Sequence, residues 1–409
     1  MNLNYVGEIT DPIHRNIRFT EIEREILDTS IFQRLRRIRQ LAGAHLVYPS
    51  AQHSRFEHSL GAMHLAGIAG NVLLSKNYIQ VEDIQKLRLA ALLHDVGHGP
   101  FSHLSEELFE RKKKLGHENI GKDIIQKTEI GDLLQKSGYD SKEISNLSFG
   151  NYQQVFFCEL ISGPLSVDIM DYLPRDAFFT GSEYGKIDYY RLINSFEVLS
   201  NGHLAIDKSA INSFESMILS RYEMFKAVYF HKTVRSGEVM MLNAMIMADE
   251  QLHFTDSNLD EYLGLTDEHT IDLICSIKEN HRASKLAIDY KNRRLLKCVF
   301  EKIFHNKNRS KKEINVNDFK KYLRKLNVDT NSIFLDISTA PSMPLTPSKR
   351  EINSVFLVNK EKEYETPISE LPVIRSLTGF LDMLRVYAVP EIRTDIETTI
   401  DNLENKQWI

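Results

Sequence analysis

The chain has 409 residues, 42% of them hydrophobic, and a formal net charge of −5 at neutral pH. This length predicts two or three structural units with ample apolar residues for a core, while so mild a charge identifies no partner. Three cysteines, far apart and odd in number, exclude a disulfide framework or a zinc knuckle and favour a reducing compartment. Because neither a signal-peptide core nor a run of about 20 apolar residues occurs, we expect a cytoplasmic protein without a membrane partner.

Apolar residues recur at helical spacing along most of the chain. Thr20 and Glu23 can form a capping box before a predicted helix over 21–41. The later segments predicted to be helical are 59–76, 84–93, 103–113, 117–127, 156–179 and 212–252. Residues 201–208 are predicted to form a short strand or turn. The pattern therefore predicts a mainly helical protein.

One block departs from the overall charge. Residues 280–325 contain 15 Lys or Arg against four Asp or Glu, a net charge of +11. A solvated helical face is the ordinary interpretation of such a block. A site for a nucleotide effector and a nucleic-acid groove are the alternatives. The interleaved aromatic residues fit helix packing as well as base stacking, so all three interpretations stay open.

Histidines gather early in the chain, where eight of the 15 lie between residues 45 and 117. The run 92–103, LLHDVGHGPFSH, contains the adjacent pair His94 and Asp95 and two further histidines. An imidazole beside a carboxylate suits a borderline or hard divalent metal. The pair ends a predicted buried helix at glycine and proline residues, so both side chains can be directed into one cavity.

Two other segments can complete a metal site. His58 ends an Arg-Phe-Glu-His run, and Asp168 lies in a predicted helix where it shares one face with Tyr172 and Asp176. Asp171 falls off that face, and we interpret it as a structural residue paired with an arginine. Two histidines and two aspartates would then hold a divalent ion and support hydrolysis of a phosphate ester.

Further side chains near these ligands fit phosphate chemistry. Arg55 precedes His58 by three residues and can recognise phosphate with both guanidinium nitrogens, although a salt bridge to Glu57 is the structural alternative. The histidines predicted to neutralise charge or to protonate a leaving oxygen are His98, His103 and His117. Those without such support, interpreted as structural or surface residues, are His45, His53 and His64.

Together these motifs resemble those of the HD-domain phosphohydrolases. The runs FQRLRRIRQL (32–41), SRFEHSLG (54–61) and LHDVGHGPFSH (93–103) are similar to the deoxynucleoside triphosphate triphosphohydrolases, the branch of the human sterile-alpha-motif and HD-domain protein and its bacterial relatives. With the helical pattern, the resemblance implies a mainly α fold. We expect a helical HD core with an N-terminal effector segment over 1–250, and a smaller mixed α+β regulatory or assembly lobe over 251–409.

The resemblance implies that water attacks the α-phosphate of a dNTP and releases a deoxynucleoside and inorganic triphosphate. The implied metal ligands are His58, His94, Asp95 and Asp168. The ion can be Fe, Mn, Zn, Ni or Mg, and a second Mg²⁺ can accompany the nucleotide. The implied catalytic residues are His103 as proton donor, Glu106 as the carboxylate that orients it, and His98 and His117 as phosphate contacts.

The resemblance also implies sites for substrate and effector. The substrate-binding positions are Gln40, Leu41, Arg55, Tyr172, Asp176, Arg221 and Tyr229. The effector positions that match recognition of a guanine nucleotide are Asp28, Gln33 and Arg36, with Lys232, Arg191 and the block 280–325 as further phosphate contacts. Activation by dGTP or GTP and a homo-oligomer, dimer or tetramer, are therefore expected. Three positions depart from the human-type pattern. Ile169 replaces a lysine, Phe225 replaces a histidine, and residues 7–10 lack the lysine and asparagine expected in the effector segment.

Two other functions remain open. The first is an HD phosphohydrolase activity on another nucleotide or phosphate ester, which the phosphate product would distinguish. The second is a nucleotide-sensing or nucleic-acid-binding module that uses the basic block 280–325. Residues suited to metal binding at all four positions argue against pure sensing, and salt-dependent binding to an oligonucleotide would support the second function as an added activity.

Overall fold

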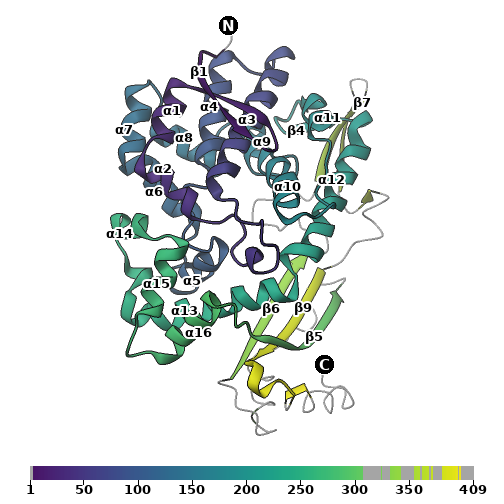
Figure 1. Ribbon diagram of the computed structural model, residues 1–409. Helices are drawn as coiled ribbons and strands as arrows, with labels where there is room; N and C mark the ends of the chain where they lie inside the picture. Colours follow the sequence, from purple (N-terminus) through teal and green to yellow (C-terminus); the bar gives the residue numbers. More distant parts are fainter. Residues whose placement is uncertain are drawn as a thin grey trace.

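The computed structural model describes residues 3–306, 324, 332–341, 354–359, 362–367, 370–371, 380–394 and 396–397. Helices dominate these residues, and sheets in the C-terminal part pack beside them (Figure 1). This architecture confirms the predicted fold class, a mainly helical HD core with a smaller mixed C-terminal region. In the described part of the chain, no helix combines the length and apolar character needed to cross a membrane.

The helices form two successive groups. The first comprises α1 (Glu21–Leu27), α2 (Ser30–Gln33), η1 (Arg34–Arg37), η2 (Ala44–Leu46), α3 (Arg55–Ser75), α4 (Val81–Leu93), α5 (His103–Lys113), α6 (His117–Lys127), α7 (Glu129–Lys136), α8 (Ser141–Ser148), α9 (Val155–Ile161) and α10 (Val167–Thr180). The second comprises α11 (Tyr189–Asn194), η3 (Lys208–Ala210), α12 (Ile211–Met224), η4 (Phe225–Tyr229), α13 (Lys232–Leu252), η5 (Phe254–Asp256), α14 (Leu259–Gly264), α15 (Asp267–Cys275), α16 (His281–Lys291) and η7 (Pro390–Ile392).

The described strands form three sheets. The N-terminal hairpin pairs β1 (Tyr5–Asp11) with β2 (Arg15–Thr20). A four-stranded sheet has the order β3 (Phe196–Val198), β4 (Leu204–Asp207), β7 (Ser354–Asn359) and β8 (Lys362–Pro367), in which β4 and β7 run parallel. An antiparallel sheet has the order β5 (Lys297–Asn306), β9 (Phe380–Ala388) and β6 (Ile333–Pro341).

Helix α3 is the central element of the core. A capping box starts it: the Ser54 backbone N–H donates to Glu57 Oε2 at 2.9 Å. Most residues of this helix are buried, and it packs against both α4 and α10. A Cβ atom at Gly61 would overlap the carboxylate of Asp171, so this glycine permits the close approach of α10.

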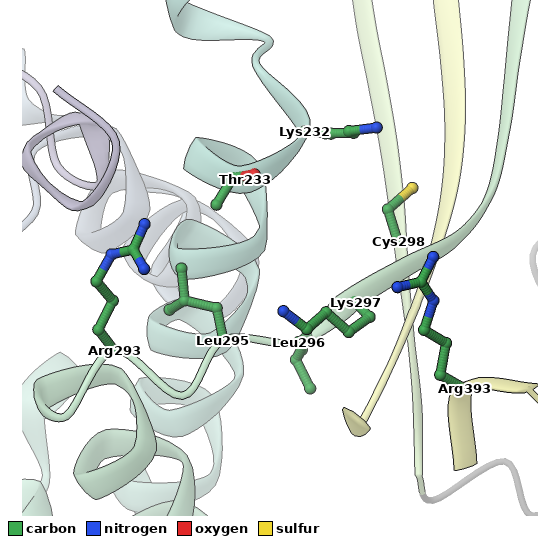
Figure 2. A pocket seen from close by; sticks show the side chains of 8 residues that line it. All are labelled: Lys232, Thr233, Arg293, Leu295, Leu296, Lys297, Cys298 and Arg393. Atoms are coloured by element: carbon green, nitrogen blue, oxygen red, sulfur yellow. The ribbon is translucent and has the colours of Figure 1, made fainter. Parts of the chain in front are cut away.

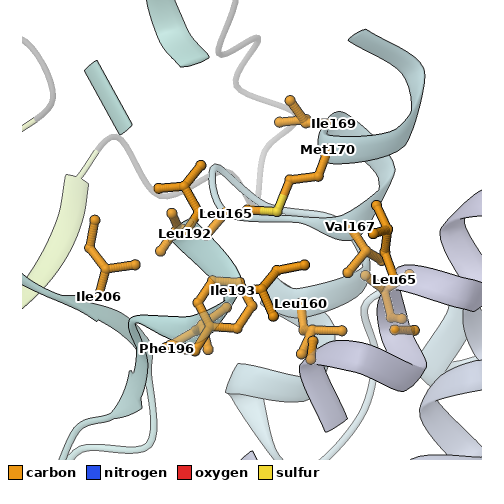
Figure 3. Close-up of a cluster of buried hydrophobic side chains, with 14 of the residues drawn as sticks. Leu65, Leu160, Leu165, Val167, Ile169, Met170, Leu192, Ile193, Phe196 and Ile206 are labelled. Atoms are coloured by element: carbon orange, nitrogen blue, oxygen red, sulfur yellow. The ribbon is translucent and has the colours of Figure 1, made fainter. Parts of the chain in front are cut away.

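The largest apolar cluster includes buried side chains of α3. Figure 3 shows its centre, where side chains of α3, α9, α10 and α11 meet those of β3 and β4. Its members include Leu65, Leu160, Val167, Met170 and Ile193, each at most 1% exposed. This rigid packing fixes the helices that carry the predicted metal ligands.

Several predicted elements are confirmed. The capping box of Thr20 and Glu23 is present, the two helices that begin at His103 and His117 have the predicted bounds, and β4 forms within 201–208. The single helix over 21–41 was wrong. Thr29 ends α1 and caps α2 by accepting from the Phe32 N–H at 3.2 Å, and the chain is extended from residue 38, where it pairs with 53–55.

Two longer segments, each predicted to form one helix, are interrupted in the structure. The segment 156–179 is split into α9 and α10 because Gly163 and Pro164 interrupt the chain. The segment 212–252 is split at the π-helical turn η4 and the following His231, whose side chain caps α13.

A second apolar cluster surrounds α13, which packs against α5 on one side and against α15, α16 and β5 on another. The expected division at residue 250 falls at the end of this helix and stays a prediction. Within the basic block, residues 307–323 and 325 lie outside the described part of the chain.

Candidate metal centre and active site

Side chains from three helical segments converge at one point. His58 Nε2 and His94 Nε2 are 3.3 Å apart, and Asp168 Oδ1 lies 3.1 Å from the first and 3.8 Å from the second. Asp95 Oδ2 lies 3.6 Å from His58 Nε2, and Asp95 Oδ1 lies 3.5 Å from His94 Nε2. Metal–nitrogen bonds of about 2.0–2.1 Å place neighbouring ligand atoms roughly 3 Å apart, so His58, His94 and Asp95 lie close enough to share one ion, and Asp168 Oδ1 adjoins both imidazoles.

Both imidazoles are held in the orientation that a metal requires. His58 Nδ1 lies 2.8 Å from Asp171 Oδ2, and His94 Nδ1 lies 2.7 Å from the carbonyl oxygen of Ala91. Donation from each Nδ1–H leaves the lone pair of Nε2 for a ligand bond. Asp171 is itself fixed by Arg175, which donates to it at 2.9 and 2.8 Å. The predicted pairing of Asp171 with an arginine is confirmed, and the same carboxylate also orients His58.

The charge at this point favours a cation. Burial opposes protonation of His58, but hydrogen bonds to Asp168 and Asp171 raise its pKa to about 10. Burial also opposes ionisation of Asp95, yet Arg55 holds the pKa of this carboxyl well below its usual range. Donor types, orientation and charge all fit a divalent ion, and imidazole with carboxylate accepts several metals.

Arg55 lies directly behind the ligands. Its guanidinium contacts Asp95, and its Nε donates to Ser102 Oγ at 2.8 Å. The structural alternative, a salt bridge, forms with Asp95 rather than with Glu57, which caps α3. Arg55 is only 2% exposed, so its contact with a substrate phosphate stays a prediction.

A second group of imidazoles adjoins Asp95. His98 Nε2 lies 3.3 Å from Asp95 Oδ1, and its ring stacks on His117 with centroids 4.0 Å apart. Burial and neighbouring cations lower the pKa of His98 well below its usual value, so it is neutral at pH 7. Glu106 accepts from His117 Nδ1 at 2.6 Å and lies 3.4 Å from Nδ1 of His103, whose side chain is 78% exposed. Glu106 thus leaves Nε2 of both imidazoles available to a ligand.

The predicted sugar-binding residues meet on α10 and η4. The hydroxyl of Tyr229 donates to Asp176 Oδ2 at 2.7 Å, and His53 Nε2 lies 2.7 Å from Asp176 Oδ1. Burial and the nearby Asp176 raise the pKa of Tyr229, which keeps its hydroxyl protonated. His53 also stacks on Phe179 at 4.6 Å, so this histidine, interpreted from the sequence as structural or surface, orients a candidate pocket residue.

Two buried polar atoms of the predicted substrate-binding residues lack hydrogen-bond partners among the described residues. They are Arg221 Nε and Gln40 Oε1. An unsatisfied buried donor or acceptor is unfavourable, and a polar ligand would satisfy both. Tyr172 lies beside Arg221, and Leu41 packs against the main apolar cluster. These positions agree with the predicted substrate contacts, whose roles stay predictions.

The predicted effector residues share one surface. Gln33 Nε2 donates to the carbonyl oxygen of Leu27 at 2.7 Å, next to Asp28, and Arg36 Nε donates to Gln33 Oε1 at 2.8 Å. Asp28 and Arg36 are exposed and Gln33 is partly exposed. They therefore present a carboxylate, an amide and a guanidinium to solvent together, and their role as an effector site stays a prediction.

A basic cavity of ≈ 330 Å³ lies where α13, β5 and η7 meet (Figure 2). Its lining residues are Lys232, Thr233, Arg293, Leu295, Leu296, Lys297, Cys298 and Arg393. Four of the eight are cationic and none is acidic. Three of these cations were predicted from the sequence as effector contacts, Lys232 by itself and the other two within the block 280–325.

Other residues behind the metal centre gave no local sequence signal. His14 Nε2 lies 2.6 Å from Asp171 Oδ1, and Asp11 Oδ2 accepts from Arg175 Nη1 at 2.7 Å. Both come from the turn of the N-terminal hairpin, far from α10 in the sequence. Their proximity to the metal centre is visible only in the folded structure, where they contact Asp171 and Arg175.

Two family profiles match the chain. The profile of the HD domain matches residues 55–147, and the profile of the HD associated region matches residues 187–403. An uncharacterized protein of Methanocaldococcus jannaschii is 34% identical over 370 residues, which cover 86% of this chain and 72% of that protein.

Proteins named for a phosphohydrolase activity are also similar to this chain. The deoxynucleoside triphosphate triphosphohydrolase SAMHD1 homolog of Dictyostelium discoideum is 32% identical over 72% of this chain, and the match spans 60% of that protein's length. A solved phosphohydrolase from Bacteroides thetaiotaomicron has a TM-score of 0.74 and 25% identity, with 93% of this chain and 99% of that chain covered.

Proposed function

Because the chain belongs to the HD-domain phosphohydrolase family, we propose that it hydrolyses deoxynucleoside triphosphates to deoxynucleosides and inorganic triphosphate. The observation that carries this proposal is the convergence of His58, His94, Asp95 and Asp168, with both Nε2 atoms directed to one point. The similarity to deoxynucleoside triphosphate triphosphohydrolases supports the substrate class.

A divalent ion held by these four residues would polarise a phosphate oxygen and lower the pKa of a bound water. Arg55 offsets the charge of Asp95, and the neutral His98 and the Glu106-oriented His117 can hydrogen-bond the phosphate oxygens. Attack of water on the α-phosphorus breaks its bond to the 5′ oxygen. The exposed His103 can protonate that oxygen and regain a proton from solvent.

The sugar would rest on the group formed by Tyr229, Asp176 and His53. These side chains hold one another by hydrogen bonds and leave little room for rearrangement. A rigid wall at this position, with Leu41 beside it, disfavours an added 2′-hydroxyl. Arg221, whose Nε has no hydrogen-bond partner among the residues that the structure describes, would bind the terminal phosphate.

The first test is to analyse the products of the metal-loaded protein. With each dNTP we expect equimolar deoxynucleoside and inorganic triphosphate, and slower turnover of the matching ribonucleoside triphosphate. Among hydrolyses at phosphorus, only attack at the α-phosphorus with loss of the 5′ oxygen yields these two products together. Ion chromatography of the phosphate product decides the outcome. Pyrophosphate or orthophosphate as the initial product would instead indicate another phosphohydrolase activity.

The basic cavity of Figure 2 is the basis for a regulatory extension of this proposal. Four cations and the amino end of the 21-residue helix α13 create a positive potential that suits nucleotide phosphates. Together with Asp28, Gln33 and Arg36, the cavity would serve dGTP or GTP as effector. Effectors bound between subunits would require a homo-oligomer, so a dimer or tetramer is expected.

Replacing Lys297 with alanine should raise the dGTP or GTP concentration that gives half-maximal activation by about tenfold. A hydrogen bond to a charged group contributes about 1.5–3 kcal/mol, so the loss of one phosphate contact has an effect of at least this size. The exposed Lys278 offers a matched control as Lys278→Ala. If dGTP and GTP leave the rate of the parent protein unchanged, the effector proposal fails while the hydrolase proposal stands.

A further inference from the structure

The loop between α4 and α5 carries His98 and leads into His103, and its backbone is strained. Phe101 has φ 57° and Ser102 has φ 51° with ψ −107°. Two consecutive residues with side chains in this region are uncommon, because Cβ clashes with the backbone there. Such strain persists only where surrounding contacts impose it, and it gathers at functional sites.

Asp267, at the start of α15, imposes one of these contacts. Its Oδ1 accepts from the Phe101 N–H at 2.8 Å, and its Oδ2 accepts from the Arg39 N–H at 3.0 Å. The side chain is 1% exposed and comes 166 residues after the loop that it holds. One buried carboxylate therefore ties the catalytic loop to the segment that precedes Gln40.

A second set of contacts holds the other end of the loop. Tyr262 donates to the carbonyl oxygen of Gly97 at 2.8 Å. Arg34 donates through Nη1 to the carbonyl oxygen of His98 at 2.9 Å and through Nε to that of Leu265 at 3.0 Å. The segment 262–267 thus contacts both ends of the loop. Tyr262 and Asp267 bond to it directly, and Leu265 is linked to it through the fully buried Arg34.

The loop is also linked to the candidate metal centre, through Ser102. Ser102 Oγ donates to the carbonyl oxygen of Arg39 at 3.0 Å and accepts from Arg55 Nε at 2.8 Å, while Arg55 contacts Asp95. Movement of Ser102 would therefore release Arg55 from one of its partners. The position of the loop and the orientation of a candidate metal ligand are coupled through two hydrogen bonds.

We propose that Asp267 is a positioning residue for hydrolysis: by fixing Phe101 it keeps His98 and His103 placed against the substrate. This inference rests on the proposed hydrolase function. Asp267 lies outside the HD-domain match at 55–147, so the C-terminal part of the chain supplies a group that the catalytic loop needs.

The test compares Asp267→Ala and Asp267→Asn with the control Asp260→Asn, an exposed residue of α14. Loss of both acceptors in Asp267→Ala should lower kcat by about 10–100-fold, because a displacement of about 1 Å at a reacting group has an effect of this size. Bound metal should stay within about twofold of the control, because Asp267 contacts Phe101 and Arg39 rather than a candidate metal ligand. Asp267→Asn keeps its shape and one acceptor and should recover part of the loss.

Amide hydrogen exchange supplies a readout independent of turnover. Exchange in peptides covering 97–103 should accelerate in Asp267→Ala and stay parental in Asp260→Asn. Parental kcat in a folded Asp267→Ala protein, or unchanged exchange across 97–103, would overturn the inference. Should Asp267→Ala not fold, two milder variants decide by the same two measurements: Asp267→Asn, which loses one of the two acceptors, and Tyr262→Phe, which loses the contact with Gly97. A parent protein without turnover would instead count against the proposed function.

Discussion

Replacing Asp95 with asparagine should lower kcat for dNTP hydrolysis by about 10³-fold and abolish stoichiometric metal binding. The amide removes the anionic donor that lies within 3.6 Å of both imidazole nitrogens. It also leaves the buried Arg55 without its carboxylate. A catalytic ion contributes several kcal/mol to the transition state, and each 1.36 kcal/mol is a factor of ten in rate, which together give this magnitude.

The measurement pairs a product assay with elemental analysis of the purified protein. Asp132→Asn is the matched control, because Asp132 is exposed on α7, far in sequence from the candidate ligands. Control protein with parental rate and metal content would show that the loss is local. Asp95→Asn protein that keeps its metal and turns over at the parental rate would remove Asp95 from the metal centre.

Replacing Arg175 with methionine should destabilise the protein by about 3–5 kcal/mol, the range measured when one partner of a buried ion pair is removed. Arg175 is 0% exposed and donates to Asp171 through two nitrogens and to Asp11 through a third. Methionine fills much of the same volume. It supplies no donor, so two buried carboxylates lose their compensating charge.

Thermal unfolding of the metal-free proteins checks this expectation, with Arg111→Met as the control. Arg111 pairs with Glu107 on the surface, where such pairs contribute little. We expect a marked fall in the apparent unfolding temperature for Arg175→Met and almost none for the control. Equal unfolding temperatures would mean that the network behind His58 is not needed for stability.

These two variants separate two roles of charge at one site. Asp95 belongs to the group of atoms that would hold the ion, whereas Arg175 lies one contact further away, behind Asp171. The first change should affect metal binding and turnover with little change in fold. The second should affect stability first and, through Asp171 and His58, metal affinity second.

The sequence predicted side chains that the structure brings close together. The run around His94 and Asp95, the position of His58 and the helical face of Asp168 predicted residues that the structure brings together. These signals are local: an adjacent pair of ligands, a helix end marked by glycine and proline, and a spacing of four residues. Helix bounds were reliable where a cap or a glycine marked them, and they failed over 21–41, where Thr29 redirects the backbone.

The tertiary structure alone decided what surrounds those ligands. Asp171 orients His58 across 113 residues, His53 binds Asp176 across 123, and Asp267 holds Phe101 across 166. No periodicity encodes such contacts, because each depends on how segments far apart in the sequence pack in the fold. A buried carboxylate requires a hydrogen-bond partner, and the packing of the core determines which histidine, arginine or backbone amide lies within reach.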